Sequence, residues 1–275
     1  FVPFLMNLRQ SRILREVRTG QCPITLKLNL NDPRIVELCG LSGASAVWLC
    51  NEHVPNEWLN LEHQIRAAKL HDMDTIVRVS KGSYSDYVKP FEMDATGIMV
   101  PMVNTADEAR RIVQMTRFHP LGKRAMDGGN MDGLFCQIPT VDYVTHTNAE
   151  RFIILQIETE EGLANVEEIA PVPAYTNLLF GPGDFSHQIG KPGQANAPEV
   201  VAARRKVAEV ARRHGKHMMT PGMLASRADL EAEGFNIFNI GADVISLGNA
   251  LNKLVADFQG SAPAAKSESF YGAKP

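Results

Sequence analysis

Two acidic side chains, Glu158 and Asp184, are the first candidates for chemistry in this chain. Each follows a short apolar run: 155–157 precedes Glu158, and 178–180 precedes a Gly-Pro-Gly turn and Asp184. Such runs are typical of buried parallel strands, whose carboxyl ends present polar side chains at one edge of a sheet. One strand–helix unit separates the pair, so the carboxylates are expected side by side. Together they suit a hard divalent cation such as Mg²⁺, whereas either alone is also typical of a helix N-terminus.

Basic side chains extend this candidate site. Arg78 lies within an apolar strand, where burying a guanidinium is costly unless it meets an anion such as a carboxylate or an enolate. The alternative for Arg78 is a structural ion pair with Glu158 or Asp184. His53 follows another apolar run and could act as a general base, or be an exposed loop residue. Lys27, inside a predicted strand, could form a Schiff base, but nothing nearby in the sequence would lower its pKa, so the metal route is favoured.

The elements that must position these residues alternate regularly along the chain. Eight apolar runs are separated by helix-like segments, which predicts an α/β fold, a (β/α)₈ TIM barrel with its site at the carboxyl ends of the strands. A single barrel domain is expected over residues 1–258, followed by a polar tail over 259–275. The predicted strands are 23–30, 46–50, 75–79, 97–101, 152–157, 177–180, 217–220 and 242–247.

The alternation breaks over residues 118–148, which are rich in glycine and show little periodicity. A loop of this length inside a compact domain is usually functional. Residues 123–137 are therefore predicted to form a lid or an intersubunit segment.

Composition excludes several classes of partner. The net charge is −3 and the pI is about 6.3, which argues against nucleic acid or an anionic membrane. No apolar run approaches a membrane span, and the first residues lack the basic region of a signal peptide. The four cysteines are widely spaced and form no CxxC pair, so a reducing, cytoplasmic location is expected.

Five segments, taken in order, resemble the HpcH/HpaI family of class II, metal-dependent 2-oxo-acid aldolases. The resemblance extends over about residues 23–258. The segments are 51–56 (Asn-Glu-His-Val-Pro-Asn), 77–79 (Val-Arg-Val), 97–103 (Gly-Ile-Met-Val-Pro-Met-Val), 156–159 (Gln-Ile-Glu-Thr) and 181–186 (Gly-Pro-Gly-Asp-Phe-Ser).

The resemblance implies a barrel of the phosphoenolpyruvate/pyruvate-binding type that forms homotrimers or homohexamers, with a C-terminal helix exchanged between subunits. It implies that Glu158 and Asp184 hold Mg²⁺, Mn²⁺ or Co²⁺, and that His53 and Arg78 are catalytic. The residues that it assigns to substrate binding are Arg78, Gln156, Gly183 and Asp184.

The implied activity is that of a lyase, an aldolase that cleaves a 4-hydroxy-2-oxo acid into pyruvate and an aldehyde through a metal-bound enolate. The alternatives are a related C–C lyase, citryl-CoA lyase-like or oxaloacetate-decarboxylating, and a catalytically silent barrel that binds an oxo acid. The sequence departs from the family at Cys50, because close homologues often have an Asp three residues before the histidine. Glu52 or a group from another chain would then orient His53.

Overall fold

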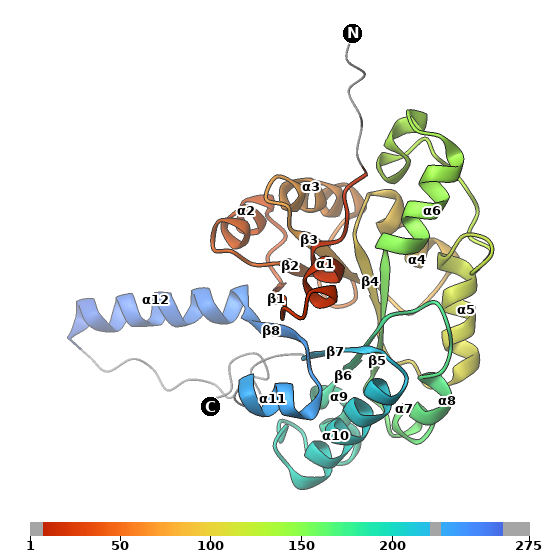
Figure 1. Cartoon of the computed structure of the whole chain (residues 1–275). Helices are drawn as coiled ribbons and strands as arrows, with labels where there is room; N and C mark the ends of the chain where they lie inside the picture. Colours follow the sequence, from red (N-terminus) through yellow and green to blue (C-terminus); the bar gives the residue numbers. More distant parts are fainter. Residues whose placement is uncertain (1–7, 221–226, 261–275) are drawn as a thin grey trace.

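Eight parallel strands close into a barrel in sequence order, which confirms the predicted fold class (Figure 1). The computed structural model describes residues 8–220 and 227–260. The strands are β1 Ile24–Leu28, β2 Ala46–Cys50, β3 Asp74–Arg78, β4 Gly97–Val100, β5 Phe152–Ile157, β6 Asn177–Phe180, β7 His217–Thr220 and β8 Ile237–Ala242. The helices are α1 Arg12–Arg18, α2 Pro33–Leu41, α3 Trp58–Lys69, α4 Tyr84–Glu92, α5 Ala106–Thr116, η1 Met131–Cys136, α6 Thr140–Glu150, α7 Glu160–Ala164, α8 Val166–Ile169, α9 Pro182–Gln188, α10 Pro198–Arg213, α11 Arg227–Glu233 and α12 Asp243–Gln259.

Local signals in the sequence explain where several helices begin. Asp32 caps α2 by accepting the backbone N–H of Arg34, and Pro33 supplies the first helical residue. Thr105 caps α5 in the same way by accepting the backbone N–H of Glu108. Each cap starts its helix a few residues after a strand end, so the preceding polar residues remain at the rim.

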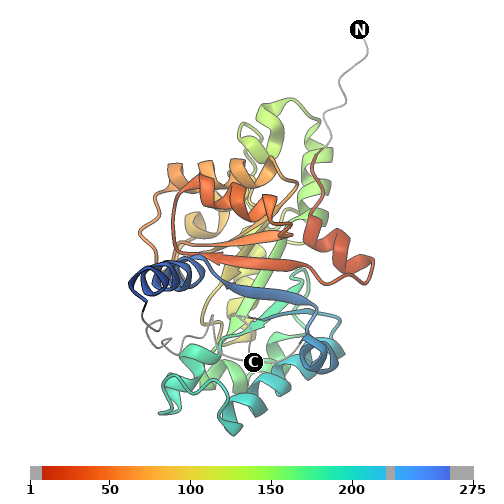
Figure 2. The ribbon, with the colours of Figure 1, turned by 90° about the vertical axis from the view of Figure 1, so that its left-hand side faces the viewer.

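The barrel interior is a separate apolar cluster that α1 closes at the amino-terminal end of the strands. Figure 2 shows α1 at one end of the strands and α12 at the other. Ile13 and Leu14 of α1 pack against inward-facing residues of the strands, including Trp48 and Phe152. The buried carboxylate of Asp74 anchors α1, since it accepts the hydroxyl of Ser11 at 2.6 Å and the backbone N–H of Ile13 at 2.9 Å. Because α1 covers the amino-terminal end, the carboxyl end of the barrel is the one where the predicted site can lie.

The last strand is not where the sequence predicted it. Residues 243–247 were expected to continue a strand from Ala242, but β8 ends at Ala242 and Asp243 begins α12. Over so short a run, the apolar residues of 242–247 fit the two-residue period of a strand as well as the 3.6-residue period of a helix. The carboxylate of Asp243 decides for the helix, because it accepts the backbone N–H groups of Asn29 and Leu30 after β1 and of Val244 in α12 itself.

The segment predicted to be a long loop contains a helix. α6 occupies its second half, and the prediction of an irregular segment throughout 118–148 is wrong there. The helix has many polar and β-branched residues, and tertiary contacts hold it: Tyr143 donates its hydroxyl to Asp132 at 2.7 Å, and Asp132 also pairs with the buried Arg124 at 2.8 Å. Residues 134–136 have left-handed backbone angles without a glycine, which is a strained arrangement. Their role as a lid or an intersubunit segment remains a prediction.

Other sequence expectations meet the structure more simply. All four cysteines are free. None of the helices within residues 8–220 and 227–260 has the length and apolar character needed to cross a bilayer. The predicted tail from residue 259 lies almost wholly outside the described residues, and the domain boundary and the cytoplasmic location stay predictions.

Gly97 and Phe152 provide a test of the barrel packing. They are paired in β4 and β5, and a Cβ on Gly97 would lie 2.1 Å from the Phe152 ring. We expect Gly97→Ala to destabilise the protein by roughly 1–3 kcal/mol through overpacking, measured by urea unfolding. Phe152→Leu in the same chain should recover part of the loss. A Gly97→Ala variant as stable as the parent would contradict this packing.

Candidate active site

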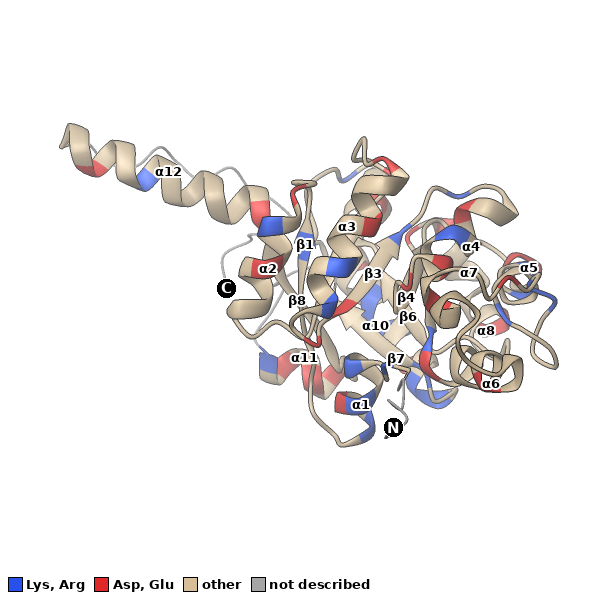
Figure 3. Ribbon diagram, turned by 90° about the horizontal axis from the view of Figure 1, so that it is seen from above, with Lys and Arg blue, Asp and Glu red and all other residues tan. Residues whose placement is uncertain are grey.

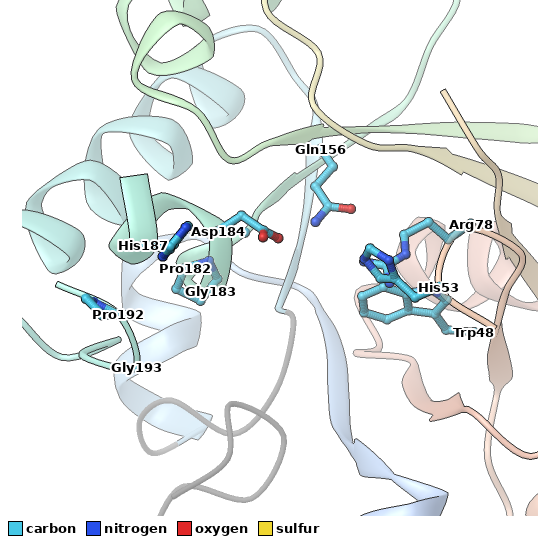
Figure 4. A pocket seen from close by; sticks show the side chains of 11 residues that line it. Trp48, His53, Arg78, Gln156, Pro182, Gly183, Asp184, His187, Pro192 and Gly193 are labelled. Carbon is cyan, nitrogen blue, oxygen red and sulfur yellow. The ribbon is translucent and has the colours of Figure 1, made fainter. Parts of the chain in front are cut away.

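A cavity of about 270 Å³ opens where the strands end at the carboxyl end of the barrel. Figure 4 shows two facing groups of side chains, with Trp48, His53 and Arg78 on one side, Asp184 and His187 on the other, and Gln156 between them. The lining residues are Trp48, His53, Arg78, Gln156, Gly181, Pro182, Gly183, Asp184, His187, Pro192 and Gly193. The cavity therefore joins the ends of β2, β3, β5 and β6.

The carboxylate of Glu158 is buried beside this cavity. Its Oε1 accepts the backbone N–H of Met102 at 2.9 Å, and its Oε2 accepts the side-chain amide of Gln156. Burial, followed by the charge of the neighbouring Asp184 carboxylate, raises the pKa of Glu158 to about 8. Asp184 also shares a hydrogen bond with Glu158 that favours the protonated form. The two carboxylates predicted to meet are thus together.

Gly181 makes this approach possible. A Cβ at this position would lie 2.5 Å from Oε2 of Glu158 and 3.0 Å from the amide nitrogen of Gln156. Any side chain would displace the carboxylate. The Gly-Pro-Gly turn consequently does more than end β6, because its first glycine leaves the space that Glu158 occupies.

Gln156 has one polar atom without a partner. Its side chain is buried, its amide nitrogen binds Glu158, and its Oε1 has no hydrogen-bond partner among the described residues. An unsatisfied buried carbonyl oxygen is costly, and such atoms commonly wait for a ligand or a water. Gln156 lines the cavity, so its oxygen is available to a molecule bound there.

Arg78 is held from several directions on the opposite wall. Its Nε lies 3.0 Å from a carboxylate oxygen of Glu52, and its Nη2 donates to the Cys50 sulfur at 3.2 Å. The guanidinium also stacks on Trp48, 5.0 Å from the ring centre. The alternative of an ion pair with Glu158 or Asp184 is not what the structure has, because the ion-pair partner is Glu52.

Cys50 is affected in turn by Arg78. Burial raises the pKa of the Cys50 thiol, but the charge and hydrogen bond of Arg78, aided by the backbone N–H groups of His53 and Glu52, outweigh burial and lower it overall. The guanidinium of Arg78 therefore favours the ionised form of the Cys50 thiol.

His53 lies at the mouth of the cavity with much of its ring exposed. Its Nε2 is 3.4 Å from the same Glu52 oxygen that contacts Arg78. The backbone N–H of His53 donates to the sulfur of Cys50 at 3.4 Å, so Cys50 contacts the backbone of His53 and Glu52 contacts the ring.

Lys27 is buried beneath the cavity floor and does not line it. Its amine lies 5.8 Å from the Trp48 ring centre, on the barrel interior. Burial, and then the nearby charge of Arg78, lower the pKa of Lys27, although sequence alone offered no cationic neighbour. The cation–π arrangement makes Lys27 a floor residue under Trp48.

The structure brings all the predicted site residues together, and it adds others. His53, Arg78, Gln156, Gly183 and Asp184 line the cavity, and Glu158 lies directly behind Gln156 and Asp184. Trp48 and His187, one turn after Asp184 on α9, also line the cavity. Glu52, which the sequence offered as one possible partner of His53, contacts both His53 and Arg78. Sequence reasoning did not place Trp48 in the site, because it reads simply as strand core.

The donor set fits a cation with few protein ligands. No group of three or more His, Cys, Asp or Glu side chains capable of holding a metal occurs within residues 8–220 and 227–260. Two carboxylates, with further positions left to water and substrate, suit Mg²⁺ and related hard cations. The raised pKa of Glu158 is the observation that supports this fit, since a cation would relieve the same repulsion that a proton now relieves.

Known proteins share this sequence and architecture. The model of the HpcH/HpaI aldolase/citrate lyase family matches residues 24–250. A hydroxypyruvate/pyruvate aldolase from Pseudomonas aeruginosa is 30% identical over 97% of this chain and 100% of its own length. A 2-keto-3-deoxy-L-rhamnonate aldolase from Escherichia coli is 28% identical over 88% of this chain and 91% of its own.

Solved structures agree with the fold. The crystal structure of citrate synthase SbnG superposes with a TM-score of 0.82 at 26% identity, covering 91% of this chain and 98% of that one. The chain therefore belongs to the HpcH/HpaI aldolase/citrate lyase family, which confirms the resemblance in the sequence and its expectation of an aldolase-type lyase.

Proposed function

We propose that this protein is a divalent-metal-dependent aldolase that cleaves a 4-hydroxy-2-oxo acid into pyruvate and an aldehyde. One observation carries the proposal: Asp184, with the buried carboxylate of Glu158 beside it, faces a buried guanidinium across one small cavity. Glu158 and Asp184 would attract a cation, and Arg78 would attract the carboxylate or enolate of a 2-oxo acid. The reactions named for the two bacterial aldolases support the same reaction class.

We assign Glu158 and Asp184 as the ligands of Mg²⁺, Mn²⁺ or Co²⁺. When bound, such an ion supplies Lewis-acid polarisation of the keto oxygen. Gln156 offers its unpartnered Oε1 to the bound molecule, and Gly183 offers backbone without a side chain beside Asp184.

Arg78 and His53 carry the residue chemistry. His53 takes the proton of the C4 hydroxyl, and the C3–C4 bond breaks so that C4 becomes the aldehyde carbonyl. The electron pair of that bond forms the enolate of pyruvate, which the Arg78 guanidinium stabilises. The proton that His53 took then returns to C3, which becomes the methyl group of pyruvate, and His53 is neutral again.

Deuterium exchange of the pyruvate methyl group tests this function. NMR in D₂O should show exchange with Mg²⁺ or Mn²⁺, because enolate formation is the reverse of the last protonation. Exchange should fall at least about 100-fold with EDTA and with Glu158→Ala, since charge stabilisation at such a site is worth several kcal/mol. Glu160→Gln, an exposed neutralisation two residues away, serves as the control.

The other outcomes separate the alternatives. Exchange that persists in EDTA would overturn the metal mechanism and direct attention to Lys27, whose Schiff base borohydride would trap. Pyruvate binding with no exchange under any condition would favour the catalytically silent barrel. Oxaloacetate decarboxylation without aldol cleavage would favour the related lyase.

The raised pKa of Glu158 predicts how pH and metal affect stability. An unfolded Glu ionises near pH 4.5, whereas folded, metal-free Glu158 holds its proton to about pH 8. The contribution of Glu158 to the free energy of unfolding is therefore fully present below about pH 4.5, and it is lost as the pH rises through about 8. Glu158→Gln stays neutral, so in EDTA its melting temperature should exceed that of the wild type by several degrees at pH 8.5, and by less at pH 5.

Mg²⁺ gives the second half of this test. It should raise the melting temperature of the wild type at pH 8.5, and leave Glu158→Gln nearly unchanged. Parallel pH profiles for the two proteins in EDTA, measured by calorimetry alongside Glu160→Gln, would contradict the buried carboxylate pair.

We also propose that the protein is a homotrimer or homohexamer in which α12 packs on another copy. Figures 1 and 3 show α12 extending away from the barrel, with few charges along it. Its exposed apolar side chains recur at intervals of three and four residues, which forms one stripe, and Phe258 is 93% exposed. These residues are Val244, Leu247, Leu251, Leu254 and Phe258. α2 next to it also exposes Leu38 and Leu41.

Light scattering after gel filtration tests the assembly. Leu251→Glu with Leu254→Glu should shift the wild-type oligomer to monomers, because two charges would be buried at the contact. Asn249→Glu with Asn252→Glu adds the same charge outside the stripe and should leave the mass unchanged. A monomeric wild type, or equal effects of both double variants, would refute the proposal.

A further inference from the structure

One carboxylate, that of Glu52, stands between the guanidinium of Arg78 and the imidazole of His53. Its Oε2 is 3.0 Å from Nε of Arg78 and 3.4 Å from Nε2 of His53. The Glu52 side chain is 18% exposed, between the buried Arg78 and the exposed His53. Glu52 follows the last residue of β2 by two positions, so the strand end sets its place.

Glu52 contacts Arg78 at a different part of the guanidinium from Cys50 and Trp48. Cys50 accepts from Nη2, and Trp48 covers one face of the guanidinium. Glu52 meets the Nε edge as an ion pair, without the alignment of a hydrogen bond. A planar guanidinium recognises a carboxylate or an enolate only when its plane is correctly oriented, so the contacts at two edges and one face determine what the cavity presents.

Glu52 acts on His53 at the nitrogen that decides the tautomer. A carboxylate next to Nε2 favours the proton on that nitrogen and leaves Nδ1 as the basic atom. At 3.4 Å the contact is longer than a good hydrogen bond, as catalytic contacts often are in structures without substrate. The sulfur of Cys50 does not supply this contact, because it accepts the backbone N–H of His53 and not the ring.

We propose that Glu52 is a positioning residue that couples the anion-binding Arg78 to the acid/base His53, and that Nδ1 of His53 takes the substrate proton. This inference rests on the proposed aldol chemistry. In this inference Glu52 orients His53, a role for which the thiol of Cys50 is unsuited. Binding an anion at Arg78 and moving a proton at His53 then depend on the same carboxylate.

Kinetics of Glu52→Gln test the inference, with Glu57→Gln as a matched control. Both changes remove one negative charge from the β2–α3 segment, and Glu57 is exposed and contacts neither cation. We expect Glu52→Gln to lower kcat for aldol cleavage roughly 10- to 100-fold, part of what a positioned acid/base contributes. Glu52→Asp should restore part of the loss, and Glu57→Gln should match the wild type.

A double-mutant cycle distinguishes positioning from general disruption. In a His53→Ala background, Glu52→Gln should cost less than about threefold in kcat, because a residue that acts through His53 has nothing left to act on. An equal cost in both backgrounds would overturn the inference. Thermal unfolding of each variant shows whether a loss comes from instability.

An NMR measurement keeps the inference testable even if the aldol proposal fails. In protein labelled with ¹⁵N-histidine at pH 8.5, the His53 ring, identified through its loss in His53→Ala, should carry its proton on Nε2. Glu52→Gln should convert it to a mixture of tautomers, and Glu57→Gln should not. An unchanged tautomer overturns the coupling, whereas absent methyl exchange in the wild type overturns the aldol chemistry alone.

Discussion

The site depends on one unfavourable contact, the approach of the buried Glu158 carboxylate to that of Asp184. Two carboxylates taken out of water repel each other, so one of them retains a proton and the pKa of Glu158 rises to about 8. The surrounding structure maintains the approach: Gly181 leaves room for it, while Gln156 and the backbone of Met102 hold Glu158 in place. A cation would relieve the repulsion in such a contact, and the contact therefore supports the proposed metal site independently of the resemblance.

The sequence predicted the barrel because its strands are buried on both faces. The run 46–50 is apolar throughout and 152–157 is apolar except for Gln156, and they match β2 and β5 residue for residue. The failures have a shared cause. Around Asp243, a short apolar run fits either period, and only the carboxylate's contacts with the chain after β1 select the helix. α6 depends likewise on Tyr143 and its buried partners, which no local pattern reveals.

Strand ends allowed most of the site to be predicted, whereas side-chain direction could not be. Glu158 and Asp184 had to lie at one end of parallel strands, and so did Arg78. Which group pairs with Arg78 depends on where each side chain points after its strand ends. The alternative considered for Arg78 was an ion pair with Glu158 or Asp184, whereas the structure pairs it with Glu52. Trp48 could not be assigned to the site from the sequence. It lies within an apolar strand, and an apolar residue there has the same pattern whether its side chain faces a cavity or a neighbouring core residue.

The cavity separates opposite charges onto opposite walls. The ends of β2 and β3 supply His53 and Arg78, and the turn after β6 supplies Asp184, with Gln156 between them. Glu158, after β5, lies beside Asp184. A 2-oxo acid would need both walls, because its carboxylate suits a guanidinium and its keto oxygen suits a cation. If the walls could exchange ion pairs, Arg78 would neutralise Glu158 and compete with any metal. Glu52 occupies the Nε edge of Arg78, and the charge of the guanidinium reaches Glu158 only as a smaller effect that opposes the rise of its pKa.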